Sequence, residues 1–124
     1  MRDKRILEYI NSAHVSPLLT SGEEVLYLKD GCVGLGMFEI LPFIVCSKVK
    51  VQPNSTLLCF TDGVTEVENE ADVPLPDSAL EEVLTSKEFV NTSDVNDSVM
   101  KMLNDYRGKA QFHDDIALIS CRFV

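Results

Sequence analysis

Two acidic residues that are far apart in the sequence each lie next to an apolar run. Asp62 follows residues 57–60, and Asp114 precedes residues 116–119. If these runs form neighbouring antiparallel strands, the end of one lies beside the start of the other, and the two carboxylates meet at one sheet edge. Crowded carboxylates repel unless they are protonated or bind a hard cation, and Mg²⁺ and Mn²⁺ prefer oxygen ligands. The pattern is typical of a divalent-metal site, with Asp115 as a third acid nearby.

A purely structural interpretation of the same residues stays open, and spacing alone favours it, because the strand pairing is an assumption. Thr-Asp-Gly after a strand is a common turn, and the acids before the last strand could keep its edge soluble. His14 and His113 could each be a ligand or a base, but neither has a partner at metal-ligand spacing. Glu66 is interpreted as a surface residue.

Composition narrows the class of protein. The chain has 124 residues and a net charge of −9, which indicates one domain or part of one and argues against a nucleic-acid partner. No apolar stretch is long enough for a membrane helix. The four cysteines form no CxxC pair, so we expect reduced thiols and a cytoplasmic protein.

Apolar and alternating segments predict strands in the first half of the chain. Residues 55–60 show no alternation of polar and apolar side chains, which predicts a strand in the centre of a sheet, buried on both faces. A turn at Asn54 precedes it, since Asn tolerates positive φ, and the glycine-rich residues 31–36 form a loop. The other strands are expected at 5–11, 17–20, 24–29 and 43–51.

The second half changes to helical periodicity. A capping box of Ser78 and Glu81 predicts one helix, and a second helix is expected from near Ser93 to Gly108. Residues 114–124 predict a last strand. The fold class is therefore α+β, with a mainly antiparallel sheet against which two helices of the C-terminal half pack.

Four motifs in this order are similar to those of one enzyme family. They are "YINSAHVSPLLT", "GCVGLGMF", "VKVQPNSTLLCFTDGVTEVEN" and "FHDDIALISCRF". Together they resemble the C-terminal part of the SpoIIE/RsbU-like PP2C phosphatase domain, including its N-A-G-H, T-D-G and closing D-D motifs. The resemblance covers nearly the whole chain, and the combination of "FTDGVTE" with "DDIAL" is specific.

The resemblance implies an α-β-β-α sandwich and metal-dependent hydrolysis of phosphoserine or phosphothreonine in a protein substrate, such as an anti-anti-sigma factor in sigma-factor regulation. In that family two Mg²⁺ or Mn²⁺ ions share carboxylates and activate a water. By motif, Asp62 and Asp114 match metal ligands, and Gly63 and Asp115 match supporting positions. No direct catalytic role is assigned, including to Asn11 and His14.

The chain also departs from the family pattern. The family's earlier G-D-x-x-D and D-x-x-G-H-G motifs are not in residues 1–124, and Ala13 stands where N-A-G-H has glycine. These departures imply an incomplete sandwich with an open sheet face, weak or absent metal binding, and little or no activity of the chain by itself. We expect a C-terminal fragment, a short protein that dimerises over this face, or a non-catalytic module that docks or dimerises through it.

Overall fold

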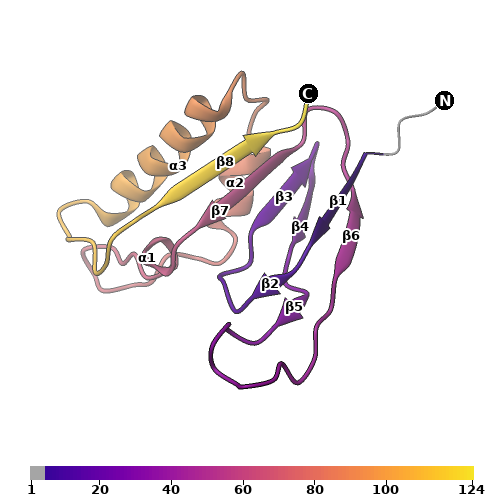
Figure 1. Cartoon of the computed structure of the whole chain (residues 1–124). Helices are drawn as coiled ribbons and strands as arrows, with labels where there is room; N and C mark the ends of the chain where they lie inside the picture. Colours follow the sequence, from indigo (N-terminus) through magenta and orange to yellow (C-terminus); the bar gives the residue numbers. More distant parts are fainter. Residues whose placement is uncertain (1–4) are drawn as a thin grey trace.

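A four-stranded antiparallel sheet forms the centre of the computed structural model, which describes residues 5–124 (Figure 1). The strand order is β4-β3-β7-β8, and every pair in it is antiparallel. Leu57 and Leu58, in the strand expected to be central, do have a strand on each side. The bounds are β3 (Leu18–Ser21), β4 (Glu24–Tyr27), β7 (Thr56–Phe60) and β8 (Leu118–Arg122).

One face of this sheet is covered by helices (Figure 1). The one-turn helix α1 (Asp62–Thr65) follows β7, and α2 (Ala79–Thr85) and α3 (Thr92–Arg107) pack behind the sheet. Leu58 is fully buried between them. The helices contribute their apolar stripes to this core, which confirms the helical periodicity: Leu80, Leu84, Val95, Val99 and Leu103.

The opposite face of the sheet is covered only in part. The antiparallel pair β1 (Ile6–Tyr9) and β6 (Ser47–Lys50) packs Leu7, Tyr9 and Val49 against it, beside Leu19 and Leu57. The short strands β2 (Asn11–Ser12) and β5 (Gly31–Cys32) form a parallel pair nearby. The layers are thus helices, a full sheet and a partial second sheet, which confirms the mixed α+β fold with antiparallel sheets.

The prediction of a strand at 43–51 is wrong in its first part. Strand β6 begins only at Ser47, and the apolar residues 43–45 lie outside any strand with their side chains exposed. In the strand expected to be buried on both faces, Leu57 and Cys59 are only half-buried. Both differences have one physical reason, since the second sheet is too small to cover the face.

The capping box predicted at Ser78 is also absent, although helix α2 begins where it was expected. Ser78 has helical φ and ψ, and its hydroxyl donates to Glu82 at 2.7 Å and caps no backbone N–H. Glu81 accepts a hydrogen bond from the Tyr27 hydroxyl instead. The second helix is capped by Asn91, whose side chain accepts from the Asp94 N–H at 2.9 Å.

Among the described residues, three non-glycine residues adopt positive φ, and one of them, Asn54, lies at a predicted turn. Asn54 has φ +65°, as the turn after β6 requires. Ala13 has φ +60°, in the position where the resembled motif has glycine. The Asn11 side chain closes this turn, since it accepts from the His14 N–H at 2.8 Å and donates to the Leu28 carbonyl at 3.0 Å.

Two further observations concern the helices and the cysteines. In the described part of the chain, no helix combines the length and the apolar composition that crossing a membrane requires. Cys32, Cys46, Cys59 and Cys121 are all free.

Candidate functional site

Strand β7 and helix α1 together hold Asp62 at one end of the sheet. Phe60 is buried in the core on one side of Asp62, and Val64 is fully buried on the other. Thr61 between them is extended, so the chain leaves the strand and enters the helix within one residue. The Asp62 side chain is exposed while its neighbours are anchored, which fixes the backbone that carries the carboxylate.

The start of β8 lies beside this end of β7 (Figure 1). The last paired residues are Phe60 and Leu118, and hydrogen bonds continue past them. The Thr61 N–H donates to the Ala117 carbonyl at 3.2 Å, and the Ala117 N–H donates to the Thr61 hydroxyl at 3.0 Å. The premise that the two strands are neighbouring and antiparallel is therefore correct.

Gly63 is the point of closest approach between the two acidic segments. A Cβ at this position would lie 2.2 Å from the Asp115 carbonyl oxygen and 3.3 Å from that of Asp114. The Thr61 hydroxyl also donates to the Asp115 carbonyl at 3.3 Å. Only glycine permits this packing, because any side chain at position 63 would overlap the backbone of the D-D segment.

The Asp114 carboxylate is oriented by the backbone N–H of the next residue. Its Oδ1 accepts a hydrogen bond from the Asp115 N–H at 2.7 Å. This bond uses one lone pair of Oδ1 and leaves the other carboxylate oxygen of Asp114 free to accept another partner. Asp62, Asp114 and Asp115 are all exposed, so their oxygens are open to solvent and to ligands.

The histidines that sequence analysis considered have other partners. His113 Nε2 lies 3.0 Å from a carboxylate oxygen of Glu68, in a pair beside the acidic edge. His14 Nδ1 lies 2.6 Å from the Val15 carbonyl oxygen. Neither histidine contacts Asp62 or Asp114 through a hydrogen bond in the described residues. Glu66 is exposed, in line with its interpretation as a surface residue.

The donor atoms suit a hard cation, but they form only part of a metal site. Carboxylate oxygens at two adjacent strand ends are the ligands that Mg²⁺ and Mn²⁺ prefer. Within residues 5–124, no group of three or more His, Cys, Asp or Glu side chains is arranged to hold a metal ion. By themselves, Asp62 and Asp114 therefore supply at most part of the ligand set that such a cation requires.

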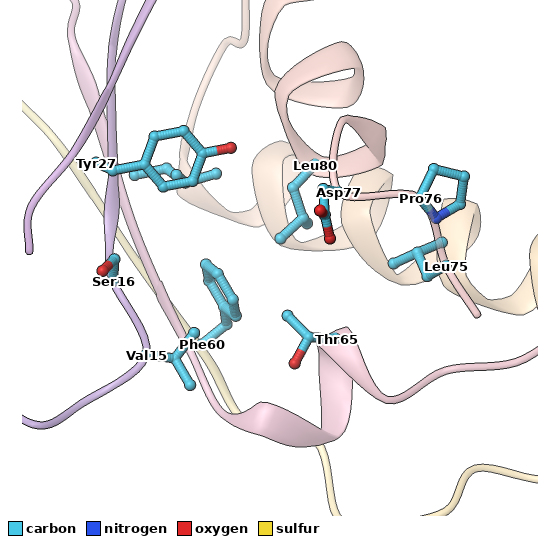
Figure 2. A pocket seen from close by; sticks show the side chains of 10 residues that line it. Val15, Ser16, Tyr27, Phe60, Thr65, Leu75, Pro76, Asp77 and Leu80 are labelled. Atoms are coloured by element: carbon cyan, nitrogen blue, oxygen red, sulfur yellow. The ribbon is translucent and has the colours of Figure 1, made fainter.

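A cavity that sequence analysis missed lies beyond α1 on the helix-covered side of the sheet (Figure 2). It is a cavity of about 420 Å³ bordered by Val15, Phe60, Thr65 and Leu80. These residues come from four separate segments, each of which looks like ordinary core or loop. No local pattern could have revealed the cavity.

The family model for stage II sporulation protein E (SpoIIE) matches residues 2–124. The chain belongs to the SpoIIE family. This membership confirms the resemblance inferred from the T-D-G and D-D motifs.

Solved structures show the same fold for this SpoIIE-family chain. The SiaA-PP2C domain of Pseudomonas aeruginosa superimposes with a TM-score of 0.81 at 22% identity, over 99% of this chain and 48% of that one. The phosphatase domain of SpoIIE from Bacillus subtilis superimposes with a TM-score of 0.70 at 14% identity, over 98% of this chain and 52% of that one. The fold is that of a PP2C phosphatase domain, over about half of the domain.

A relative by sequence is Protein IcfG of Synechocystis sp. It is 28% identical over 115 residues, which are 92% of this chain and 18% of IcfG. The SpoIIE-family chain thus spans about half the length of the two phosphatase-domain structures and less than a fifth of this relative.

Proposed function

We propose that residues 1–124 form the C-terminal part of a metal-dependent protein serine/threonine phosphatase domain. The observation that supports this most is the packing of Gly63 against the Asp115 carbonyl, which brings the T-D-G and D-D motifs together at one sheet edge. Asp62 and Asp114 would bind Mg²⁺ or Mn²⁺, with Gly63 and Asp115 supporting them. The SpoIIE phosphatase domain of Bacillus subtilis was solved after presoaking with Mn, in agreement with this choice of metal.

The chain's own groups would position the cation and leave room for the substrate. Bound divalent cations would supply a water activated for attack on phosphorus and would neutralise charge on the phosphoryl group. The backbone N–H of Asp115 holds one Asp114 oxygen, so this carboxylate is oriented before binding. The anchored neighbours Phe60 and Val64 limit the movement of Asp62. We assign no residue here to proton transfer.

With two carboxylates for a site that takes two cations in the complete family domain, the 124 residues alone would bind metal weakly and have little or no activity. The remaining ligands, and the cover for the open sheet face, would come from an N-terminal half or from a second copy of the chain. By analogy with RsbU-like relatives, the substrate would be a cytoplasmic phosphoprotein such as an anti-anti-sigma factor, in sigma-factor regulation. A membrane or nucleic-acid partner is not part of this proposal.

Phosphate release from a phosphoserine peptide tests the proposal, measured on the product of the whole reading frame that encodes residues 1–124 and on the chain alone. Release should require Mn²⁺ or Mg²⁺, should fall by about 100-fold or more in Asp62→Asn and in Asp114→Asn, and should be weak or absent for the chain alone. Metal-independent release, or full activity of both variants, would contradict the proposed site. Normal release by the chain alone would contradict its incompleteness.

A second candidate function is a non-catalytic PP2C-like module that docks or dimerises through the uncovered sheet. The exposed apolar residues of β8 and of the segment before β6 favour it, since soluble proteins rarely expose such surfaces without a partner. Calorimetric titration with Mn²⁺ of the product of the whole reading frame that encodes residues 1–124 separates the two functions. A complete catalytic site binds about two ions per site, whereas a docking module binds the metal weakly or not at all.

A further inference from the structure

The cavity beyond α1 has the size and lining of a site for one apolar group. Its volume of about 420 Å³ is within the range of about 300–1,000 Å³ that ligand sites occupy. Figure 2 shows the Tyr27 ring on one side of the space and the segment that carries Leu75, Pro76 and Asp77 on the other. Most of its lining is apolar, contributed by Val15, Leu18, Phe60, Leu75, Pro76 and Leu80.

Negative charge borders one side of this cavity. The Asp77 side chain lines it, and the half-buried Glu81 accepts a hydrogen bond from the Tyr27 hydroxyl, which points across the cavity toward Asp77 (Figure 2). No Lys or Arg of residues 5–124 forms an ion pair with either acid. Burial and the charge of Glu81 and Asp77 raise the pKa of Tyr27 to about 12. The acidic side of the cavity therefore favours a positively charged group on whatever binds there.

A free strand edge runs beside the cavity. Strand β4 is the outer strand of its sheet and pairs only with β3 among the described residues. The Leu28 N–H donates to the Pro17 carbonyl, so by alternation the peptide N–H groups of Val25 and Tyr27 point away from β3. The side chains of Val25 and Tyr27 lie on the face that carries the cavity.

We propose that β4 and this cavity form a docking site for an extended segment of a partner protein. The segment would add to the sheet at β4, place an apolar side chain in the cavity, and set a Lys or Arg opposite Asp77 and Glu81. A protein segment fits better than a small molecule, since the exposed peptide groups of β4 offer main-chain hydrogen bonds beside a side-chain pocket. Alternate residues of a strand share a face, so the basic residue stands two positions from the apolar one. This docking does not depend on metal binding at Asp62.

A peptide titration followed by the amide NMR signals of the ¹⁵N-labelled chain tests the site. The probe is an acetylated, amidated peptide of sequence Thr-Lys-Thr-Leu-Thr-Lys-Thr. Two matched probes replace its leucine by alanine or its lysines by glutamates. We expect saturable shifts at the amides of Val25, Tyr27 and Leu80 with the first probe, and affinities at least 10-fold lower with the other two. Equal shifts with all three probes, or none with the first, would overturn the proposal.

Variants of the chain distinguish binding at the cavity from a general attraction of the basic probe to the acidic protein. Asp77→Asn and the cavity-filling Ser16→Phe should each lower the affinity of the chain for the first probe at least about threefold. The control Glu88→Gln removes the same charge as Asp77→Asn at an exposed position that does not line the cavity, and should leave the affinity unchanged. Urea unfolding of each variant establishes that it is folded. Equal weakening by Asp77→Asn and Glu88→Gln, or shifts confined to residues outside β4 and the cavity, would contradict the proposal.

Discussion

Single backbone positions decide how closely the two acidic motifs approach each other. The Asp115 carbonyl oxygen lies against Gly63, where the Cβ of any other residue would be. The Thr61 hydroxyl donates a hydrogen bond to the same carbonyl and accepts one from the Ala117 N–H. The sequence predicted the two acids at neighbouring strand ends because Asp62 and Asp114 flank apolar runs. It could not predict the contact at Gly63, since a T-D-G triplet is equally compatible with a free turn.

Gly63→Ala tests this contact. The added Cβ meets backbone, which cannot rotate away as a side chain can, so we expect a loss of about 1–3 kcal/mol in the free energy of unfolding. Urea unfolding measures it. In the control Gly34→Ala, the new Cβ would come closest to the Met37 sulfur, at 2.9 Å, and its three nearest atoms all belong to side chains, so the loss should be much smaller. Equal losses would show that Gly63 is not specially constrained.

Ala13→Gly should stabilise the chain. Ala13 has φ +60°, a conformation that costs a non-glycine residue about 1–2 kcal/mol, while glycine costs about 0.5–1 kcal/mol in chain entropy. The expected gain in the free energy of unfolding is about 0.5 kcal/mol, measured by urea unfolding. The exposed Ala71, which is not among the positive-φ residues, serves as a control, because Ala71→Gly should only destabilise. A loss of stability in Ala13→Gly would contradict the strain.

Secondary-structure elements were predictable where an apolar pattern coincides with burial. Helix α3 follows its apolar stripe and ends at Gly108, as expected. The interpretation of Ser78 and Glu81 as a capping box failed because Tyr27, from a distant strand, takes the Glu81 carboxylate. A local motif cannot reveal a competing partner 54 positions away.

The contact between Tyr27 and Glu81 gives a pH dependence at the level of elements, since it joins β4 to α2. The folded-state pKa of Tyr27 is about 12, above the value of 10.0 for an unperturbed tyrosine. Its contribution to stability is therefore complete below pH 10 and is lost as the pH rises toward 12, because the unfolded chain releases the proton first. Urea unfolding between pH 9 and 11 should show a decline that is smaller in Tyr27→Phe. The same decline in both proteins would contradict the assignment.

At the scale of the whole molecule, the main feature is a central sheet with one face only partly covered. Helices cover one face of the central sheet, but β1 and β6 cover only part of the second face, and Ile119 on β8 remains 65% exposed. The open face was predictable from the motifs that the chain does not contain. The exposure of residues 43–45 was not predictable from the sequence. Their apolar pattern predicts a buried strand, and a strand is buried only where another layer covers it.

The open face should make the isolated chain self-associate, since exposed apolar surface is buried when two copies meet. We expect sedimentation equilibrium to show association that Ile119→Lys weakens by about 10-fold or more. The control Val90→Lys alters an even more accessible apolar side chain, 83% exposed, before helix α3, and should have no effect. A monomer at all concentrations, or equal effects of the two variants, would contradict association through this face.

Binding of a cation between Asp62 and Asp114 is the central claim, and paramagnetic Mn²⁺ tests it most directly. Substoichiometric Mn²⁺ added to the ¹⁵N-labelled chain should broaden the amide signals of residues 61–63 and 114–116 before any others. Asp62→Asn should abolish this broadening in both segments, while the control Asp97→Asn, an exposed acid on helix α3, should leave it unchanged. Broadening that persists in Asp62→Asn, or that begins elsewhere on the chain, would contradict a shared site.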